Sequence, residues 1–237
     1  ITSVFLLTRI DYDYVVVPQI QMSLGKKVKT LLSRLTGMLF KNKAYRDFEI
    51  GFMFYGVSFM LSVSVITIYL ANELNLSYSD LAFYKNGNVT LTILLLPFFG
   101  RLIGKIDPRK FAIITYVFLA LYIFFIGFTS YFSSNIEVFG IRVYYSLFIA
   151  FVFFGLFAAS MTLLWSIGSS YFSSDEDASE YQAIHLSLTG LRAAVAPVMG
   201  IVLYELFGYN VTFIISIVLL LFGMWLMRWS IKKNSSN

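Results

Sequence analysis

The chain has 237 residues, of which 58% are hydrophobic and only 13% are charged. Soluble domains carry about 25% charged residues, so this composition indicates an integral membrane protein and excludes a soluble globular one. The chain has no cysteine and a single histidine, His185, which excludes disulfides, thiol nucleophiles and cysteine-ligated metal sites.

Residues 1–8 are apolar up to Arg9, and we expect them to be the inner end of a membrane span that precedes this chain. Residues 9–46 then form a basic cytoplasmic linker. Within it, residues 26–41 have apolar side chains at helical spacing with lysines beside them, which predicts an amphipathic helix. This helix lies either on the inner membrane surface or against the cytoplasmic ends of the bundle, and the sequence leaves both open.

Residues 47–233 are predicted to form a bundle of six transmembrane helices. Each span needs about 20 largely apolar residues to cross about 30 Å of hydrocarbon, and open sheets cannot cross lipid. The chain is therefore interpreted as an all-α integral membrane protein, with a tight turn at Gly208 between the last two spans. The predicted spans are 50–71, 81–103, 110–129, 143–166, 183–206 and 210–230.

The basic residues predict the orientation of the bundle. All of them except Lys85, Arg142 and Arg192 fall before span one, between spans two and three, or after span six. Basic residues in short loops mark the cytoplasmic side, so both chain ends are expected to be cytoplasmic. We expect a plasma membrane or a bacterial inner membrane. The positive net charge follows from this topology, and no nucleic-acid partner is expected.

Polar residues follow one face of four spans: the first, second, fourth and fifth. Spans three and six are almost purely apolar and are expected to be peripheral. A side chain facing lipid gains nothing from a hydroxyl or an amide, so the four polar faces predict a cavity. A serine or threonine hydroxyl can instead bond the backbone of its own helix. The substrate-path candidates are Tyr55, Ser58, Ser62, Lys85, Asn88, Thr92, Trp165, Thr189 and Arg192.

Arg192 lies deep inside span five and is the member farthest from the cytoplasmic surface in a polar stripe with Gln182, His185 and Thr189. A buried guanidinium needs an acid, carbonyl groups, water or an anionic ligand. No acid of this chain is expected at the same depth, so the sequence predicts a hydrated cavity or a partner outside the chain. His185, nearer the inner surface, is expected to be a neutral ring that bonds a loop.

These features together resemble the C-terminal half of a major facilitator superfamily transporter. The resemblance lies in six spans with both ends inside, in the loop GRLIGKIDPRK, and in the Gly, Arg and Pro of the run TGLRAAVAPVMG. It implies half of a twelve-helix alternating-access fold whose N-terminal six-helix half is missing from this fragment. It further implies secondary transport of a small solute, no enzyme activity and no cofactor, with possible coupling to a proton or sodium gradient.

The loop between spans two and three carries part of the cytoplasmic signature of that family. Gly104 stands where the signature has an acid, and Asp107 is one residue out of step with it. Asp107 followed by Pro108 is typical of a helix N-cap, although a charge network that holds an inner gate is the alternative. The candidates for this gate loop are Gly100, Arg101, Lys105, Asp107 and Arg109.

Three other classes of function fit the sequence less well than transport does. A channel and a membrane-embedded enzyme are less favoured, because pore repeats and intramembrane metal or acid pairs are absent from the sequence. A non-transporting scaffold or subunit is harder to exclude, because polar helix faces also suit a protein interface. The expected partners are a small-molecule substrate, membrane lipid and the missing half.

Overall fold

The computed structural model describes residues 23, 25, 33, 36–174 and 177–235. Contacts divide the chain into a first unit, Ile1–Met38, and a second, Leu39–Asn237. The prediction for residues 1–8 lies outside the described residues, as does most of the prediction for the linker 9–46. Of the predicted amphipathic helix 26–41, only residues 33 and 36–41 are described, and these are helical.

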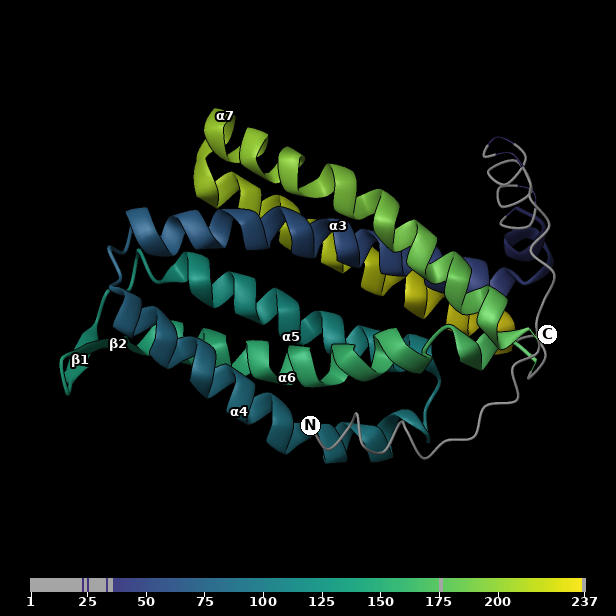
Figure 1. Cartoon of the computed structure of the whole chain (residues 1–237), viewed down its shortest axis with the longest axis horizontal. Helices are drawn as coiled ribbons and strands as arrows, with labels where there is room; N and C mark the ends of the chain where they lie inside the picture. Colours follow the sequence, from purple (N-terminus) through teal and green to yellow (C-terminus); the bar gives the residue numbers. More distant parts are fainter. Residues whose placement is uncertain (1–22, 24, 26–32, 34–35, 175–176, 236–237) are drawn as a thin grey trace. The chain divides into compact units, whose positions relative to one another are not determined.

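The second unit is a bundle of long helices with a small β-hairpin at one end (Figure 1). The helices run back and forth, so the bundle has a basic end, where α3, α5 and α7 begin, and a hairpin end, where the two strands lie. The elements are α3 (Lys43–Asn72), α4 (Tyr78–Ile103), α5 (Pro108–Phe128), β1 (Asn135–Val138), β2 (Ile141–Tyr144), α6 (Tyr145–Ile167), η1 (Ser170–Phe172) and α7 (Ala178–Ser235).

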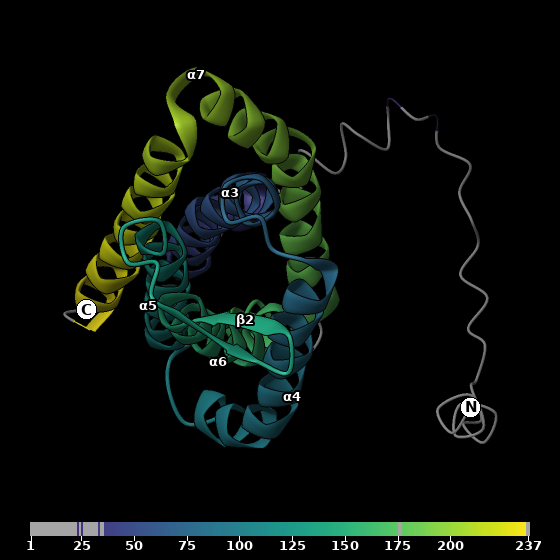
Figure 2. The same ribbon diagram turned by 90° about the vertical axis from the view of Figure 1, so that its left-hand side faces the viewer.

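In the described part of the chain, five helices are long and apolar enough to cross a membrane, one fewer than predicted. The difference arises in α7, which contains both predicted spans 183–206 and 210–230. Gly208 interrupts it with φ 76° and ψ 174°, a conformation open to glycine but not to residues with a Cβ. The chain turns back there, so α7 has a first arm (residues 178–207) and a second arm (residues 209–235), as Figures 1 and 2 show.

Side-chain caps set where α3, α4 and α5 start. Asn42 caps α3 by accepting a hydrogen bond from the backbone N–H of Tyr45. Ser77 and Asp80 form a reciprocal capping box at the start of α4. Asp107 caps α5, and Pro108 occupies its first turn, so the predicted cap is confirmed.

The β-hairpin begins in the segment 130–142, between predicted spans three and four, and the sequence pattern does not predict it. β1 and β2 pair antiparallel, with Asn135 opposite Tyr144. Phe139 and Gly140 both have positive φ, as a tight two-residue hairpin turn requires. Val143, the predicted first residue of span four, therefore lies in β2, and the helix begins at Tyr145.

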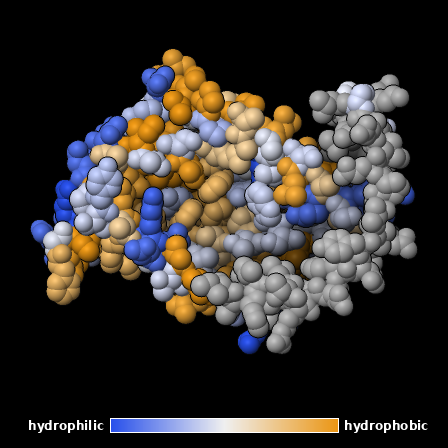
Figure 3. Space-filling model, viewed as in Figure 1, coloured by the Kyte–Doolittle hydropathy of each residue, from blue (hydrophilic) through white to orange (hydrophobic). Residues whose placement is uncertain are grey.

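The core forms where both arms of α7 pack against α3, and α4 packs on α6 (Figure 2). The first arm approaches α3 so closely that a Cβ built on Gly200 would lie 2.6 Å from the carbonyl oxygen of Leu61. The outer surface of this arm is apolar. In Figure 3 apolar atoms cover much of the upper surface along α7, and hydrophilic atoms gather at the hairpin end. This apolar covering is what a lipid-facing or partner-facing helix surface requires.

Candidate functional site

Arg192 lies buried between the first arm of α7 and α3. Its side chain is only 4% exposed, and its Nη1 donates a hydrogen bond to the carbonyl oxygen of Phe52 over 2.7 Å. Gly56 makes room for the guanidinium, because any Cβ at that position would collide with it. In the described part of the chain, no carboxylate forms an ion pair with Arg192. A carbonyl group is therefore its direct hydrogen-bond partner.

Three aromatic rings surround the same guanidinium. Its Cζ lies 5.0 Å from the ring centroid of Phe52, 5.5 Å from that of Tyr55 and 6.0 Å from that of Trp165. Cation–π contacts stabilise a desolvated cation by about 2 kcal/mol. The rings come from α3 and α6, so Arg192 joins three helices. The structure thus brings together three predicted path residues: Tyr55, Trp165 and Arg192.

A buried acid–imidazole pair lies toward the basic end of the same interface. His185 Nδ1 is 3.0 Å from Oε1 and 3.2 Å from Oε2 of Glu49, and the side chains are 1% and 3% exposed. The prediction that His185 bonds a loop was wrong, because its partner is a carboxylate on α3. The sequence pattern does not predict this pair, since the two residues are 136 positions apart in the chain.

Four buried polar atoms in this region have no hydrogen-bond partner among the described residues. They are His185 Nε2, Thr189 Oγ1, Arg192 Nε and the hydroxyl oxygen of Tyr116. The Tyr116 ring stacks on Tyr55 at 5.1 Å, which ties α5 to the same group. Buried polar atoms without partners are rare and are concentrated at functional sites. We call this group the arginine cluster, and its members are Glu49, Phe52, Tyr55, Tyr116, Trp165, His185, Thr189 and Arg192.

The two serines predicted to line the path are fully buried inside the bundle. Ser58 donates to the carbonyl oxygen of Ser216 on the second arm of α7, over 2.7 Å. Ser62 donates to the carbonyl oxygen of Phe59 in its own helix. Both hydroxyls are therefore used by backbone groups, as hydroxyls in membrane helices often are.

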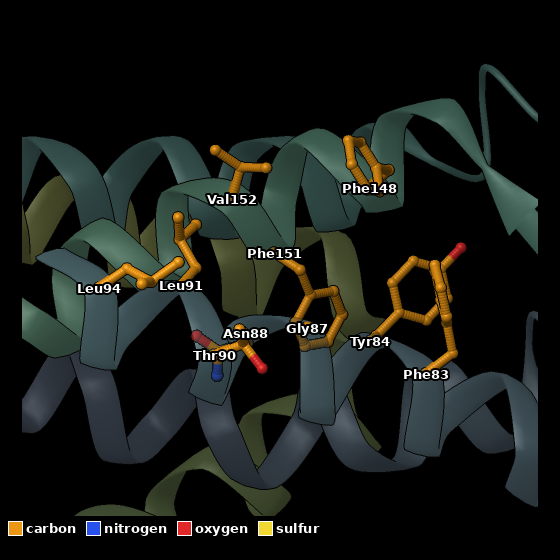
Figure 4. Close-up of a pocket in the computed structure, with 10 residues that line it drawn as sticks. All are labelled: Phe83, Tyr84, Gly87, Asn88, Thr90, Leu91, Leu94, Phe148, Phe151 and Val152. Carbon is orange, nitrogen blue, oxygen red and sulfur yellow. The ribbon is translucent and has the colours of Figure 1, made fainter.

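The path candidates of α4 lie apart from the arginine cluster, on the side of α6 that faces α4. Lys85 is exposed, and the Thr92 hydroxyl donates to the carbonyl oxygen of Asn88 in its own helix. Asn88 lines a groove of about 400 Å³ between α4 and α6 (Figure 4). Apart from Thr90, the rest of this groove is apolar and aromatic, with Tyr84 and Phe151 stacked at 5.0 Å.

Of the gate-loop candidates, Arg109 is buried, Asp107 is half-buried and the other three are exposed. Asp107 pairs with Arg109 over 2.7 Å, and Arg109 donates from Nη1 to the hydroxyl of Ser230 on α7. The Arg109 guanidinium also lies over the ring of Phe172 in η1. Arg109 thus joins the start of α5, the second arm of α7 and η1 at the basic end. Gly100, Arg101 and Lys105 are exposed and take no part in this contact.

The Asp107 carboxyl is held in its charged form by its neighbours. Burial disfavours that form, but hydrogen bonds from the side chain and backbone N–H of Arg109 outweigh burial. The positive charges of Arg109 and Lys110 act in the same direction. The pKa of Asp107 therefore lies below its ordinary value, and the carboxylate is ionised at neutral pH.

Phe172 is a residue at this end that sequence reasoning missed. Its ring packs against Phe48 at 5.1 Å and Tyr45 at 6.0 Å, and its carbonyl oxygen accepts a hydrogen bond from Asn42. A phenylalanine between a tyrosine and a serine in a short connection gives no periodic signal, so only the tertiary structure reveals its packing between α6 and α7.

One comparison with known proteins identifies a family. The family model described as Major Facilitator Superfamily matches residues 49–237, which covers the bundle from the inner part of α3 onward. No curated protein and no solved structure shows a significant match to the chain.

Proposed function

Because the chain belongs to the major facilitator superfamily, a family of secondary transporters, we propose that it moves a small solute across a membrane by alternating access. Two six-helix halves would rock about a site near the bilayer midplane, and this bundle would supply one of them. The observation that carries this proposal is Arg192, a buried cation with an unpartnered N–H between helices of an apolar bundle. Ionisable residues inside a membrane are costly and mark substrate or ion pathways.

The exposed faces of the bundle support a second half as its partner. In a bundle that crosses a membrane, α4 is mostly exposed, and it carries the polar candidates Lys85, Asn88 and Thr92. A helix with such a face is suited to a hydrated path closed by another half rather than to lipid. Membrane lipid then covers the remaining apolar surfaces. Both chain ends are proposed to be cytoplasmic, because the basic end carries most of the lysines and arginines.

The test is solute uptake by the full-length protein in liposomes. Uptake of radiolabelled acetate, benzoate, phosphate, glucose and a lipophilic cation is compared with uptake by protein-free liposomes. We expect saturable uptake of at least one solute. Arg192→Ala should lower that uptake at least tenfold while the amount of inserted protein stays normal, and Lys43→Gln, which removes an exposed cation, should not. A protein that takes up none of the solutes would contradict the proposal.

A further inference from the structure

We propose that the arginine cluster binds one proton at His185 together with one anionic group of the substrate at Arg192. The transported species would then be an organic or inorganic anion that moves with a proton. This inference rests on the proposed function and adds to it the charge of the substrate and the identity of the coupling ion.

The first argument is the charge of the cluster. Glu49 and Arg192 carry opposite charges, so the buried cluster is neutral overall when His185 is neutral. Adding a proton alone would bury one net positive charge, and adding an anion alone would bury one net negative charge. Both are costly in a site of low dielectric constant. Binding the two together leaves the cluster neutral, so each favours the other.

The second argument is the place that the structure provides for the proton. A neutral imidazole carries its hydrogen on one nitrogen only, and the neighbouring Glu49 carboxylate favours that hydrogen on Nδ1. The other nitrogen, Nε2, is then an acceptor, and it is buried without a partner among the described residues. An incoming proton adds to Nε2, and the charged ring that results is stabilised by Glu49.

The third argument is the set of donors that an anion would meet. The carbonyl of Phe52 occupies one N–H of Arg192, and the Nε–H remains without a described partner. The hydroxyls of Thr189 and Tyr116 are also buried and unpartnered. A guanidinium edge with two parallel N–H groups suits a carboxylate or a phosphate, and neighbouring hydroxyls can donate to the remaining oxygens.

The proton site and the anion site share two aromatic contacts. The Phe52 ring lies 4.5 Å from the ring of His185 and 5.0 Å from the Arg192 guanidinium. Trp165 contacts the same two side chains, at 5.7 Å and 6.0 Å. Only one aromatic ring separates the two side chains, so a change of charge at His185 alters the electrostatic potential at Arg192.

The other titratable groups near His185 do not compete for the proton. Tyr45 on α3 and Tyr116 on α5 face the Glu49–His185 pair, and tyrosine ordinarily titrates at about pH 10, far above neutral pH. The group that α6 contributes is the indole of Trp165, which does not titrate. Glu49 is the carboxylate of the cluster, and His185 occupies it, so a proton suits this site better than a sodium ion does.

The experiment measures proton uptake by the purified full-length protein in detergent. Protein in unbuffered salt at neutral pH, with an indicator dye, receives sodium benzoate, acetate or sulfate adjusted to the same pH, and receives sodium chloride or glucose as controls. Anion binding is followed in parallel by equilibrium dialysis with the radiolabelled anion. We expect about one proton taken up per benzoate, acetate or sulfate bound, and none with glucose. Absence of proton uptake with all three anions would overturn the inference.

Two variants separate the roles of the residues, and a third is the matched control. His185→Gln should bind the anion more weakly and take up no proton. Glu49→Gln leaves the resting cluster with one net positive charge, so it should bind the anion at least as tightly as the original protein but without a proton. Lys43→Gln should behave as the original protein does. Proton uptake by both Glu49→Gln and His185→Gln would overturn the inference even if one of them folds poorly.

The outcome also separates this inference from the proposed function. If liposomes take up a neutral solute and no anion brings a proton, transport stands and the inference fails. If proton and anion bind together but no solute crosses the membrane, the cluster is a coupled binding site and the transport proposal fails.

Discussion

Arg192 remains charged in an apolar interior because its neighbours provide a hydrogen-bond acceptor, aromatic faces and space for the guanidinium. The Phe52 carbonyl accepts one hydrogen bond, and three aromatic faces take the place of water around the cation. Gly56 supplies the space, since a side chain on α3 at that position would occupy the volume of the guanidinium. A glycine and an arginine on different helices thus form one packing unit.

Asp107 both caps α5 and pairs with Arg109. Mutation can separate these two contributions to stability. Asp107→Ala removes the N-cap of α5 and the partner of Arg109. Loss of a cap costs about 1 kcal/mol, which lowers the melting temperature of a protein of this size by about 2–4 °C. We expect at least this decrease in a thermal melt in detergent. A melting temperature equal to that of the original protein would show that the cap contributes nothing.

Asp107→Asn is the matched control, because asparagine caps helices about as well as aspartate. The amount by which its melting temperature stays below that of the original protein should depend on pH. The folded pKa of Asp107 is lowered, so the contribution of its charge is complete above the ordinary carboxyl pKa of 3.8 and is lost as the pH falls through the lower folded value. The difference in melting temperature between the original protein and Asp107→Asn should therefore shrink below about pH 4. A constant difference down to pH 2 would contradict this assignment.

At the scale of helices, the packing of α7 around α3 holds the cluster in place. Both arms contact α3, and the first arm presents Gly200 to the backbone of Leu61. Close backbone approach at small residues is how helices associate where lipid removes the hydrophobic driving force. The position of Arg192 against α3 therefore depends on a glycine two turns further along the same arm.

Gly200→Ala tests this dependence, and Gly190→Ala is its control in the same arm. The new Cβ at position 200 would lie 2.6 Å from a carbonyl oxygen, whereas at position 190 nothing lies within 4 Å. Overpacking costs about 1–3 kcal/mol, and we expect Gly200→Ala to lower the melting temperature accordingly. Gly190→Ala should leave it unchanged or raise it slightly, because alanine forms helices better than glycine. Equal behaviour of the two variants would rule out close packing at Gly200.

The elements themselves were largely predictable from the sequence. Hydrophobic length fixed the helices to within a few residues, except that α3 begins at Lys43, well before the predicted Ile50. This difference arises because Asn42 starts the helix inside a stretch with too many charges to suggest a span. The hairpin was missed because each strand has only four residues, too few for alternation to stand out from a polar loop.

At the scale of the whole molecule, which helix faces which neighbour was only partly predictable. The polar stripe of α7 correctly singled out Arg192 as a buried residue. The contact between Glu49 and His185 could not be predicted from the sequence. It depends on how α3 and α7 pack, and the residue pattern of neither helix specifies that packing. The same is true of the substrate-path candidates on α4 and α7. The sequence suggests that they line one path, but they lie on different sides of α6.

The orientation of the bundle in the membrane is tested by labelling single cysteines. The chain has no cysteine of its own, so each variant carries one thiol. Ser134 lies next to β1 at the hairpin end and Ser174 lies between η1 and α7 at the basic end, and both are exposed. Because basic loops stay on the cytoplasmic side, Ser134→Cys should react with a membrane-impermeant maleimide in intact cells. Ser174→Cys should react only after the membrane is permeabilised. Labelling of Ser174→Cys in intact cells would reverse the orientation and place the Glu49–His185 pair toward the outer side.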